Sequence, residues 1–282
     1  MGGKADSLAI SFADIKNECR KWDFSKNNII EILDEPFSTG RMYVDSFGCS
    51  NGLYNVDALS IKKSFKTKRT RTWEKVNFID FANDLIKEIG LNLETYGIDN
   101  FQYERVDQVE QNNMEFLRYR CMLEGYNLKI SNGKAIIVSE KFLESQNSVL
   151  ALDPSLFIGK YKFKCTSNHI YGGCEVSSFS KEFIKGSYIL NNSIGEVKKI
   201  TDVNTSSLGE TTRFAKNILR SFNKLETTGS FTISKNTNIA AGNTILLENL
   251  SMFNGKYIIE SVLHDLVNAK SFLTVRKVLE GY

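Results

Sequence analysis

The chain has 282 residues, of which 41% are hydrophobic and 24% are charged, and its formal net charge is only +3. This length suits one large domain or two to three ordinary ones, and the hydrophobic fraction is sufficient for packed cores. The small net charge excludes a nucleic-acid binder that relies on bulk positive charge, so we expect no nucleic-acid recognition.

The cysteines and the N-terminal sequence indicate in which cellular compartment the protein is made. No two of the five cysteines have the C-x-x-C spacing of a zinc site; they are Cys19, Cys49, Cys121, Cys165 and Cys174. We expect reduced thiols in a protein made in a cytoplasm, with a Cys165–Cys174 pair across a hairpin as the alternative. No signal-peptide pattern and no apolar run of about 18 residues occurs, so we expect no ordinary export signal and no membrane span.

Residues 1–70 have the alternation of antiparallel strands. In the stretch DSLAISFAD, the larger apolar side chains fall on one face of a strand, at Leu8, Ile10 and Phe12. A two-residue turn is expected at Asn51-Gly52, between two runs rich in aromatic and β-branched residues. We predict a first small β-barrel domain over residues 1–70.

A basic run, KTKRTRT at residues 66–72, follows this region. It is interpreted as a solvated loop, with a charged patch facing an acidic partner as the sharper hypothesis. Phe65 and Trp73 flank it, as aromatics do in single-strand binders, but the overall charge does not support that reading.

Residues 71–143 change to a helical period and predict an inserted α/β domain. Thr72 is a candidate N-cap and Gly90 a candidate stop for a first helix. The apolar face of that helix contains Phe78, Phe81, Leu85 and Ile89. A strand near residues 101–107, a second helix and a hairpin turning at Asn132-Gly133 complete an α-β-α-β-β pattern.

Residues 144–282 are predicted to form a second β-barrel domain that contains one helix, at about residues 206–225. Ser206 or Ser207 is its expected N-cap, with Glu210 in the capping-box position. In the last part, FNGKYIIESVLHDL predicts a turn followed by a strand whose two faces alternate. One face is expected to hold Tyr257, Ile259 and Ser261, and the other Ile258, Glu260 and Val262.

The predicted fold class is therefore α+β and mainly β, with two small antiparallel, tube-like β-barrel domains flanking an inserted α/β domain. The many strand edges of such a fold need cover, which favours assembly into an oligomer.

The sequence contains no clear catalytic motif. His264 and Asp265 are neighbours in a predicted strand, so their side chains point to opposite faces and do not form a dyad. His169 lies near Cys174, and a cysteine–histidine pair has no local support. No glycine-rich phosphate loop occurs. We therefore predict that the chain is not an enzyme, and we assign no catalytic, cofactor-binding or metal-binding residues and no cofactor.

Several segments, in the correct order, resemble one family. The first motif, an Ala-Asp-x-Leu strand leading to an aspartate and then a tryptophan, consists of Ala5, Asp6, Leu8, Asp14 and Trp22. Later matches are Gly52, Tyr54, Val56 and Asp57; the helix after Trp73; Phe116, Leu117, Glu124, Gly125, Tyr126, Leu128 and Lys129; and Ala215, Lys216, Leu219 and Arg220. This order resembles the phage late control protein D family, the baseplate hub proteins of contractile tails, which are similar to the hub part of the type VI secretion spike protein.

The resemblance implies a non-enzymatic hub of a contractile phage tail or phage-tail-like bacteriocin. Three copies would form a ring with pseudo-sixfold symmetry that joins the hexameric tail tube to the trimeric spike. Other baseplate proteins and the tape measure protein are further implied partners, and membranes are not. The implied location is the host cytoplasm during assembly and then the tail baseplate of the virion or the bacteriocin particle.

One departure from the family concerns the first barrel. Family members usually carry further residues before the Ala-Asp motif, whereas only four residues precede Ala5 here. The first barrel is therefore expected to be short at its N-terminal side, and a neighbouring chain or residues 144–200 are the candidates to complete it. A cell-wall (peptidoglycan) hydrolase of the tail tip and a carbohydrate-binding β-module are the alternative functions.

Overall fold

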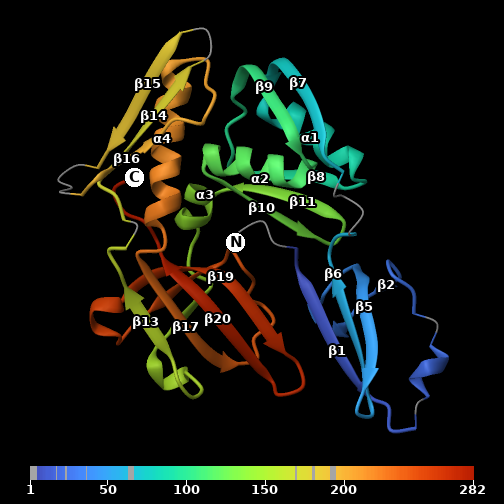
Figure 1. Cartoon of the computed structure of the whole chain (residues 1–282). Coiled ribbons are helices and arrows are strands. Elements are labelled where there is room, and N and C mark those ends of the chain that lie inside the picture. The colour runs from blue at the N-terminus through green and yellow to red at the C-terminus, as the bar shows by residue number, and fades with distance from the viewer. Residues whose placement is uncertain are drawn as a thin grey trace.

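The computed structural model describes residues 5–16, 18–22, 24–35, 37–62, 67–168, 170–179, 182–190 and 195–282. Strands dominate these residues, and four α-helices accompany them. Figure 1 shows two groups of strands, one at each end of the sequence, below a middle part that contains the helices. The predicted mainly β, α+β fold class is confirmed. None of the helices in these ranges is long and apolar enough to cross a membrane.

The first sheet is antiparallel and small. Its order is β1 (Ser7–Ala13), β6 (Leu53–Leu59), β5 (Met42–Ser50) and β2 (Ile29–Ile30). β5 and β6 turn at Asn51-Gly52, where φ is +50° and +75°, the left-handed values that a type I′ turn needs. A separate two-stranded hairpin, β3 (Leu33–Asp34) and β4 (Phe37–Ser38), follows β2.

The middle part holds two β elements and three helices. A long ribbon pairs β7 (Arg69–Asn77) with β9 (Gln102–Gln111), and a three-stranded sheet has the order β10 (Tyr126–Ser131), β11 (Lys134–Ser139), β8 (Asn92–Tyr96). The helices are α1 (Phe78–Glu88), α2 (Asn113–Glu124) and α3 (Glu140–Ser145). The predicted hairpin at Asn132-Gly133 is present.

The predicted start of the first helix, at Thr72, is wrong. Residues up to Asn77 form strand β7, and Asn77 precedes the first helical residue, Phe78. Trp73 lies opposite Val106 in β9, and its ring stacks on that of Phe116 with centroids 6.0 Å apart. Pairing with a distant strand therefore overrides the local helical pattern. The predicted apolar face from Phe78 to Ile89 is buried as expected.

The C-terminal sheet has six strands and is curled (Figure 1). Its order is β12 (Leu150–Leu152), β18 (Thr244–Leu247), β19 (Gly255–Asp265), β20 (Lys270–Lys277), β17 (Thr227–Ser234) and β13 (Lys162–Cys165). One face holds a core that includes Phe231, Tyr257, Ile259 and Leu273.

A β-bulge in β19 changes the predicted faces of this strand. Tyr257 and Ile259 point into the core as expected, but the register shifts between Ile259 and Ser261. Beyond the bulge Val262 packs on the core, whereas Ser261 is exposed. The extra residue reverses the alternation, and for this reason the predicted placement of Ser261 and Val262 is wrong.

The remaining elements join the middle part. Strands β15 (Phe183–Ile189), β14 (Gly173–Phe179) and β16 (Val197–Ile200) form a sheet that lies beside α4 (Leu208–Asn223) in Figure 1. The helix predicted near 206–225 is thus present, but its buried face shares one core with α1 and α2. We expected it within the segment of the second barrel, and it packs with the middle part instead. The domain limits themselves stay predictions.

Candidate assembly surfaces and buried polar networks

His264 and Asp265 have separate partners. The two ring nitrogens of His264 lie 3.0 Å from Ser271 Oγ and 3.3 Å from the carbonyl oxygen of Ile239. Asp265 accepts hydrogen bonds from Asn268 instead, at 2.9 Å from its backbone nitrogen and 2.7 Å from its side chain. Burial lowers the pKa of His264, which favours the neutral ring. The histidine therefore braces the end of a hairpin, and the aspartate caps the turn.

The other residues singled out from the sequence are dispersed. His169 lies outside the described residues. All five cysteines are free thiols, with Cys49 and Cys165 exposed. Burial raises the pKa of Cys174 to about 11, which leaves it protonated near neutral pH. Within the described ranges, no group of three or more histidine, cysteine or acidic side chains could hold a metal ion.

The two arginines of the basic run pair within the molecule. Arg71 forms an ion pair with Glu88, and its guanidinium lies 4.7 Å from the centre of the Trp73 ring. Arg69 approaches the same carboxylate at 3.7 Å. The Arg71 hydrogen bond lowers the pKa of Glu88. These arginines thus fasten the β7–β9 ribbon to α1. Residues 63–66 lie outside the described residues.

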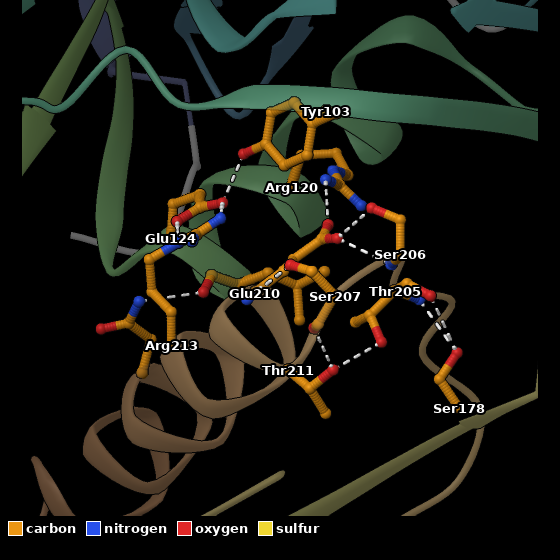
Figure 2. A network of polar contacts seen from close by, with 12 residues as sticks. Tyr103, Arg120, Glu124, Ser178, Thr205, Ser206, Ser207, Glu210, Thr211 and Arg213 are labelled. Atoms are coloured by element: carbon orange, nitrogen blue, oxygen red, sulfur yellow. Dashed lines mark hydrogen bonds and ion pairs between the residues drawn. The ribbon is translucent and has the colours of Figure 1, made fainter. Parts of the chain in front are cut away.

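The first buried polar network joins α2 to α4 (Figure 2). Glu124 at the end of α2 is fully buried and accepts hydrogen bonds from Arg213 at 2.6 and 3.0 Å. Tyr103 of β9 also donates to Glu124. Burial, with the Glu124 charge, raises the pKa of Tyr103, so the phenol stays a donor at any physiological pH. The guanidinium of Arg213 also lies 3.8 Å from the centre of the Phe101 ring. The buried carboxylate of Glu124 is therefore compensated by the charge of Arg213 and by the Tyr103 hydrogen bond.

Next to it, the N-terminus of α4 is capped in two ways. Ser207 accepts a hydrogen bond from the Glu210 backbone at 3.2 Å, and the Glu210 carboxylate accepts from the Ser206 backbone at 2.8 Å. The predicted capping box is present, with Ser206 as the residue that Glu210 reaches. Figure 2 also shows Arg120 facing Glu210, at 3.9 Å.

The second network joins the middle part to the C-terminal sheet. Glu144 of α3 pairs with Arg220 of α4 at 2.7 Å and with Arg276 of β20 at 2.8 Å. Arg276 is 1% exposed and also pairs with Glu260 of β19 at 2.7 Å. A parallel pair, Lys224–Glu140 at 2.7 Å, lies one helical turn away. We call the Glu144–Arg220–Arg276–Glu260 group the junction clasp.

Sequence reasoning missed both networks. Arg120 and Glu124 lie four residues apart on the same face of α2 as its buried apolar residues. This position on the apolar face is the local signal that could have predicted their burial. Arg276 follows Val275 in a strand, so alternation assigns it to the outer face. At Arg276 that face meets Glu144 of α3, and the sequence of β20 does not show this contact.

Several surfaces are open to partners. Large apolar side chains are exposed at the tip of the β14–β15 hairpin, where Phe179 is 78% and Phe183 55% exposed, with ring centroids 4.8 Å apart. In the C-terminal sheet, Leu263 and Phe272 form an exposed cross-strand pair. Strands β1, β13 and β15 are sheet edges that pair on one side within the described residues. Such edges and apolar side chains are typical of chains that assemble.

The comparisons identify the fold. No family model matches the chain, and no curated protein matches it. A 43 kDa tail protein of prophage MuSo2 from Shewanella oneidensis has a TM-score of 0.72 at 10% identity, over 96% of this chain and 89% of that one. A tail protein from Neisseria meningitidis MC58 has a TM-score of 0.74 at 12% identity, over 97% and 88%. The architecture is thus that of phage tail proteins.

A third structure extends the likeness to secretion systems. The E. coli c3393 protein, a type VI secretion component described as similar to the T4 tail proteins gp27 and gp5, has a TM-score of 0.63 at 6% identity, over 98% of this chain and 70% of that one. At such low identities the likeness shows the fold alone. At that level, the resemblance to the baseplate hub family read from the sequence is confirmed.

Proposed function

We propose that this chain is a structural hub protein of a contractile phage tail or a phage-tail-like bacteriocin. The observation that carries the proposal is the near full-length fold match to tail proteins, which covers at least 96% of this chain and 88% of theirs. The proposed places are the host cytoplasm during assembly and then the tail baseplate or the bacteriocin particle.

The proposed assembly is a trimeric, pseudo-sixfold ring that joins the hexameric tail tube to the trimeric spike, next to other baseplate proteins and the tape measure protein. Two separate β-sheets, one near each end of the chain, support it, because three copies then present six β units. The exposed edges of β1 and β15 support it as well, because a closed ring hides main-chain groups that would otherwise pair at random.

The test is the mass of the purified chain in solution. Light scattering behind a sizing column should give about three times the 32.0 kDa of one chain, and electron microscopy should show rings. The chain should also co-sediment with tail tube and spike proteins produced from the same gene neighbourhood. A monomer that joins neither protein at micromolar concentration would refute the hub.

The chain is also proposed to act without catalysis. The alternatives, a peptidoglycan hydrolase and a carbohydrate-binding module, have no specific observation in their favour. A cell-wall lysis assay with purified protein tests the first: activity that disappears in His264→Gln would establish a hydrolase. Retention on a polysaccharide column would support the second.

A further inference from the structure

Strand β13 is an open edge of the C-terminal sheet. Its residues Lys162–Cys165 pair antiparallel with β17, and no other strand of the described ranges pairs with its far side. In Figure 1 it lies at the outer border of that sheet. Half of the backbone donors and acceptors of an edge strand point away from its one partner, so they are available to an added strand.

One face of this strand is basic. Lys162 and Lys164 are exposed and, two residues apart, project from the same face. Lys160, just before the strand, is exposed too. None of the three forms an ion pair with a described residue. This contrasts with Arg69 and Arg71, which both approach the carboxylate of Glu88. The charge of the β13 lysines is therefore left for a partner.

The opposite face anchors the strand. Phe163 packs over Gly229 of β17 so closely that a Cβ at that glycine would lie 2.3 Å from its ring. The Phe163 ring centroid is 5.6 Å from that of Phe253 and 6.1 Å from those of Phe231 and Tyr257. A strand held by aromatic contacts on one face presents its lysines and its open edge in a fixed arrangement, which lowers the entropy cost of binding.

An apolar groove continues from the end of the strand. Its volume is about 500 Å³, and its lining includes Lys164, Ile170, Phe222 and Leu225. Leu225 lies just after the end of α4 and is 51% exposed, so its apolar side chain is accessible to a partner. The groove thus brings three apolar side chains together with Lys164, and its other lining residues are Thr166, Asn168 and Ser221. Its volume falls in the range of pockets that bury a large side chain or a small ligand.

We propose that β13 and this groove bind an extended acidic segment of a partner protein by strand addition. Backbone groups of the segment would pair with the open edge of β13, its alternate carboxylates would meet Lys162 and Lys164, and one apolar side chain at its end would fill the groove. Lysines on an edge strand also discourage pairing between like edges. That role does not account for an apolar groove next to them, whereas an acidic segment with an apolar end matches both. The inference does not depend on the trimeric ring.

The test uses fluorescent synthetic peptides of about eight residues, a usual strand length. The probe has glutamate at alternate positions, valine or threonine between them and leucine at one end. Its control has lysine in place of glutamate. We expect fluorescence anisotropy to show saturable binding of the acidic peptide only, weakening as salt rises. Equal binding of the two peptides, or no binding of the acidic one at low salt, would overturn the proposal.

Protein variants locate the site. Lys162→Glu with Lys164→Glu should weaken acidic-peptide binding about tenfold or more, because attraction becomes repulsion. The matched control, Lys16→Glu with Lys26→Glu, makes the same change in net charge at exposed lysines of the first sheet region and should leave binding unchanged. An equal loss of acidic-peptide binding in both variants would mean that only the overall charge matters, and it would refute the proposed site at β13. Circular dichroism verifies that each variant is folded.

Two further measurements separate strand addition from simple ion pairing. Proline at alternate peptide positions removes backbone donors, so it should abolish binding although the charges remain. Leu225→Ser should weaken binding about fivefold for the peptide that ends in leucine and hardly at all for one that ends in alanine. Binding that tolerates the prolines, or a Leu225 variant that affects both peptides alike, would refute this mode.

Discussion

The first sheet and the C-terminal sheet are both antiparallel or nearly so, but they differ in the number of buried apolar residues that pack against them. Among the described residues, the apolar cluster of the first sheet has four buried members, Cys19, Val44, Tyr54 and Val56, whereas that of the C-terminal sheet has ten. Around the first cluster, Trp22 and Phe47 remain 46% and 43% exposed. Apolar burial is the main stabilising term, so the first sheet depends more on its neighbours.

The two sheets also differ in how they are attached. The C-terminal sheet is fastened by the junction clasp, in which Glu144 and Arg276 are buried. The first sheet and the separate β3–β4 hairpin are fastened by weaker contacts. Among them are the hydrogen bond from Ser60, just after β6, to the Ile130 carbonyl at 2.9 Å, and the Asp34–Lys235 ion pair of the hairpin at 2.7 Å. A buried ion pair is costly to break on one side, and an exposed one contributes little. The C-terminal sheet should therefore move with the helical part, and the first sheet more independently.

The largest expected effect comes from breaking the clasp. Glu144→Gln removes the carboxylate that pairs with both buried arginines, Arg220 and Arg276, and we expect a loss of about 3 kcal/mol in the free energy of unfolding. Urea titration followed by circular dichroism measures it. Hydrogen exchange should rise first in β17–β20, because these strands lose their tie to α3.

Two control variants define what the clasp contributes. Glu280→Gln, at an exposed glutamate, should change stability by less than about 0.5 kcal/mol. Glu144→Leu combined with Arg220→Met and Arg276→Met should recover much of the loss, because neither buried arginine of the clasp is then left without its carboxylate. If Glu144→Gln were as mild as Glu280→Gln, the clasp would not be what joins the C-terminal sheet.

Core substitutions sharpen the contrast between the sheets. Ile259→Ala leaves a cavity in the larger core and should cost about 2–4 kcal/mol, felt throughout the C-terminal sheet. Val56→Ala should cost about 1–2 kcal/mol. In the second variant, faster hydrogen exchange should be confined to residues of the first sheet. Exchange that rises equally in all three parts would mean that the first sheet unfolds only with the rest.

A smaller effect is expected where the β3–β4 hairpin touches the C-terminal part of the chain. Lys235 and Asp34 are about one-third exposed, so Asp34→Asn should cost about 0.5 kcal/mol or less and less still at high salt. The matched variant is Asp84→Asn, at an exposed aspartate that contacts the Trp73 ring nitrogen at 3.3 Å. A loss above about 1 kcal/mol for Asp34→Asn would show that the first sheet is held by this contact more than by packing.

Structural features that depend only on residues close together in the sequence could be predicted. The Asn132-Gly133 turn and the Ser207–Glu210 cap each depend on residues within four positions of one another, and both are present as predicted. The strand at Trp73 depends on a partner about thirty residues away, and the bulge after Ile259 on its pairing with β20. The clasp depends on residues from α3, α4 and two strands. Contacts of this range leave no periodic pattern, so sequence reasoning missed them.

The smallest effect concerns His264, which lies where the β3–β4 hairpin meets the C-terminal sheet, its ring 5.6 Å from that of Phe37. Burial lowers its pKa below the ordinary value of 6.5. The unfolded chain therefore binds the proton first as the pH falls. The contribution of His264 to stability is constant above pH 6.5, decreases as the pH falls from there through the folded-state pKa, and is constant again below it.

His264→Gln removes this titration. The urea midpoint of the native protein should fall more between pH 7.5 and pH 5.5 than that of His264→Gln, and His169→Gln serves as the control for the other histidine. The difference between the two curves, rather than either curve alone, isolates His264 from the carboxylates that titrate at lower pH. If the difference had the opposite sign, the ring would be stabilised as the cation. It would then have to face a carboxylate, and the contact of the two sheets would be electrostatic. The expected sign instead assigns this contact to packing against Phe37, with the neutral ring held by Ser271 and Ile239.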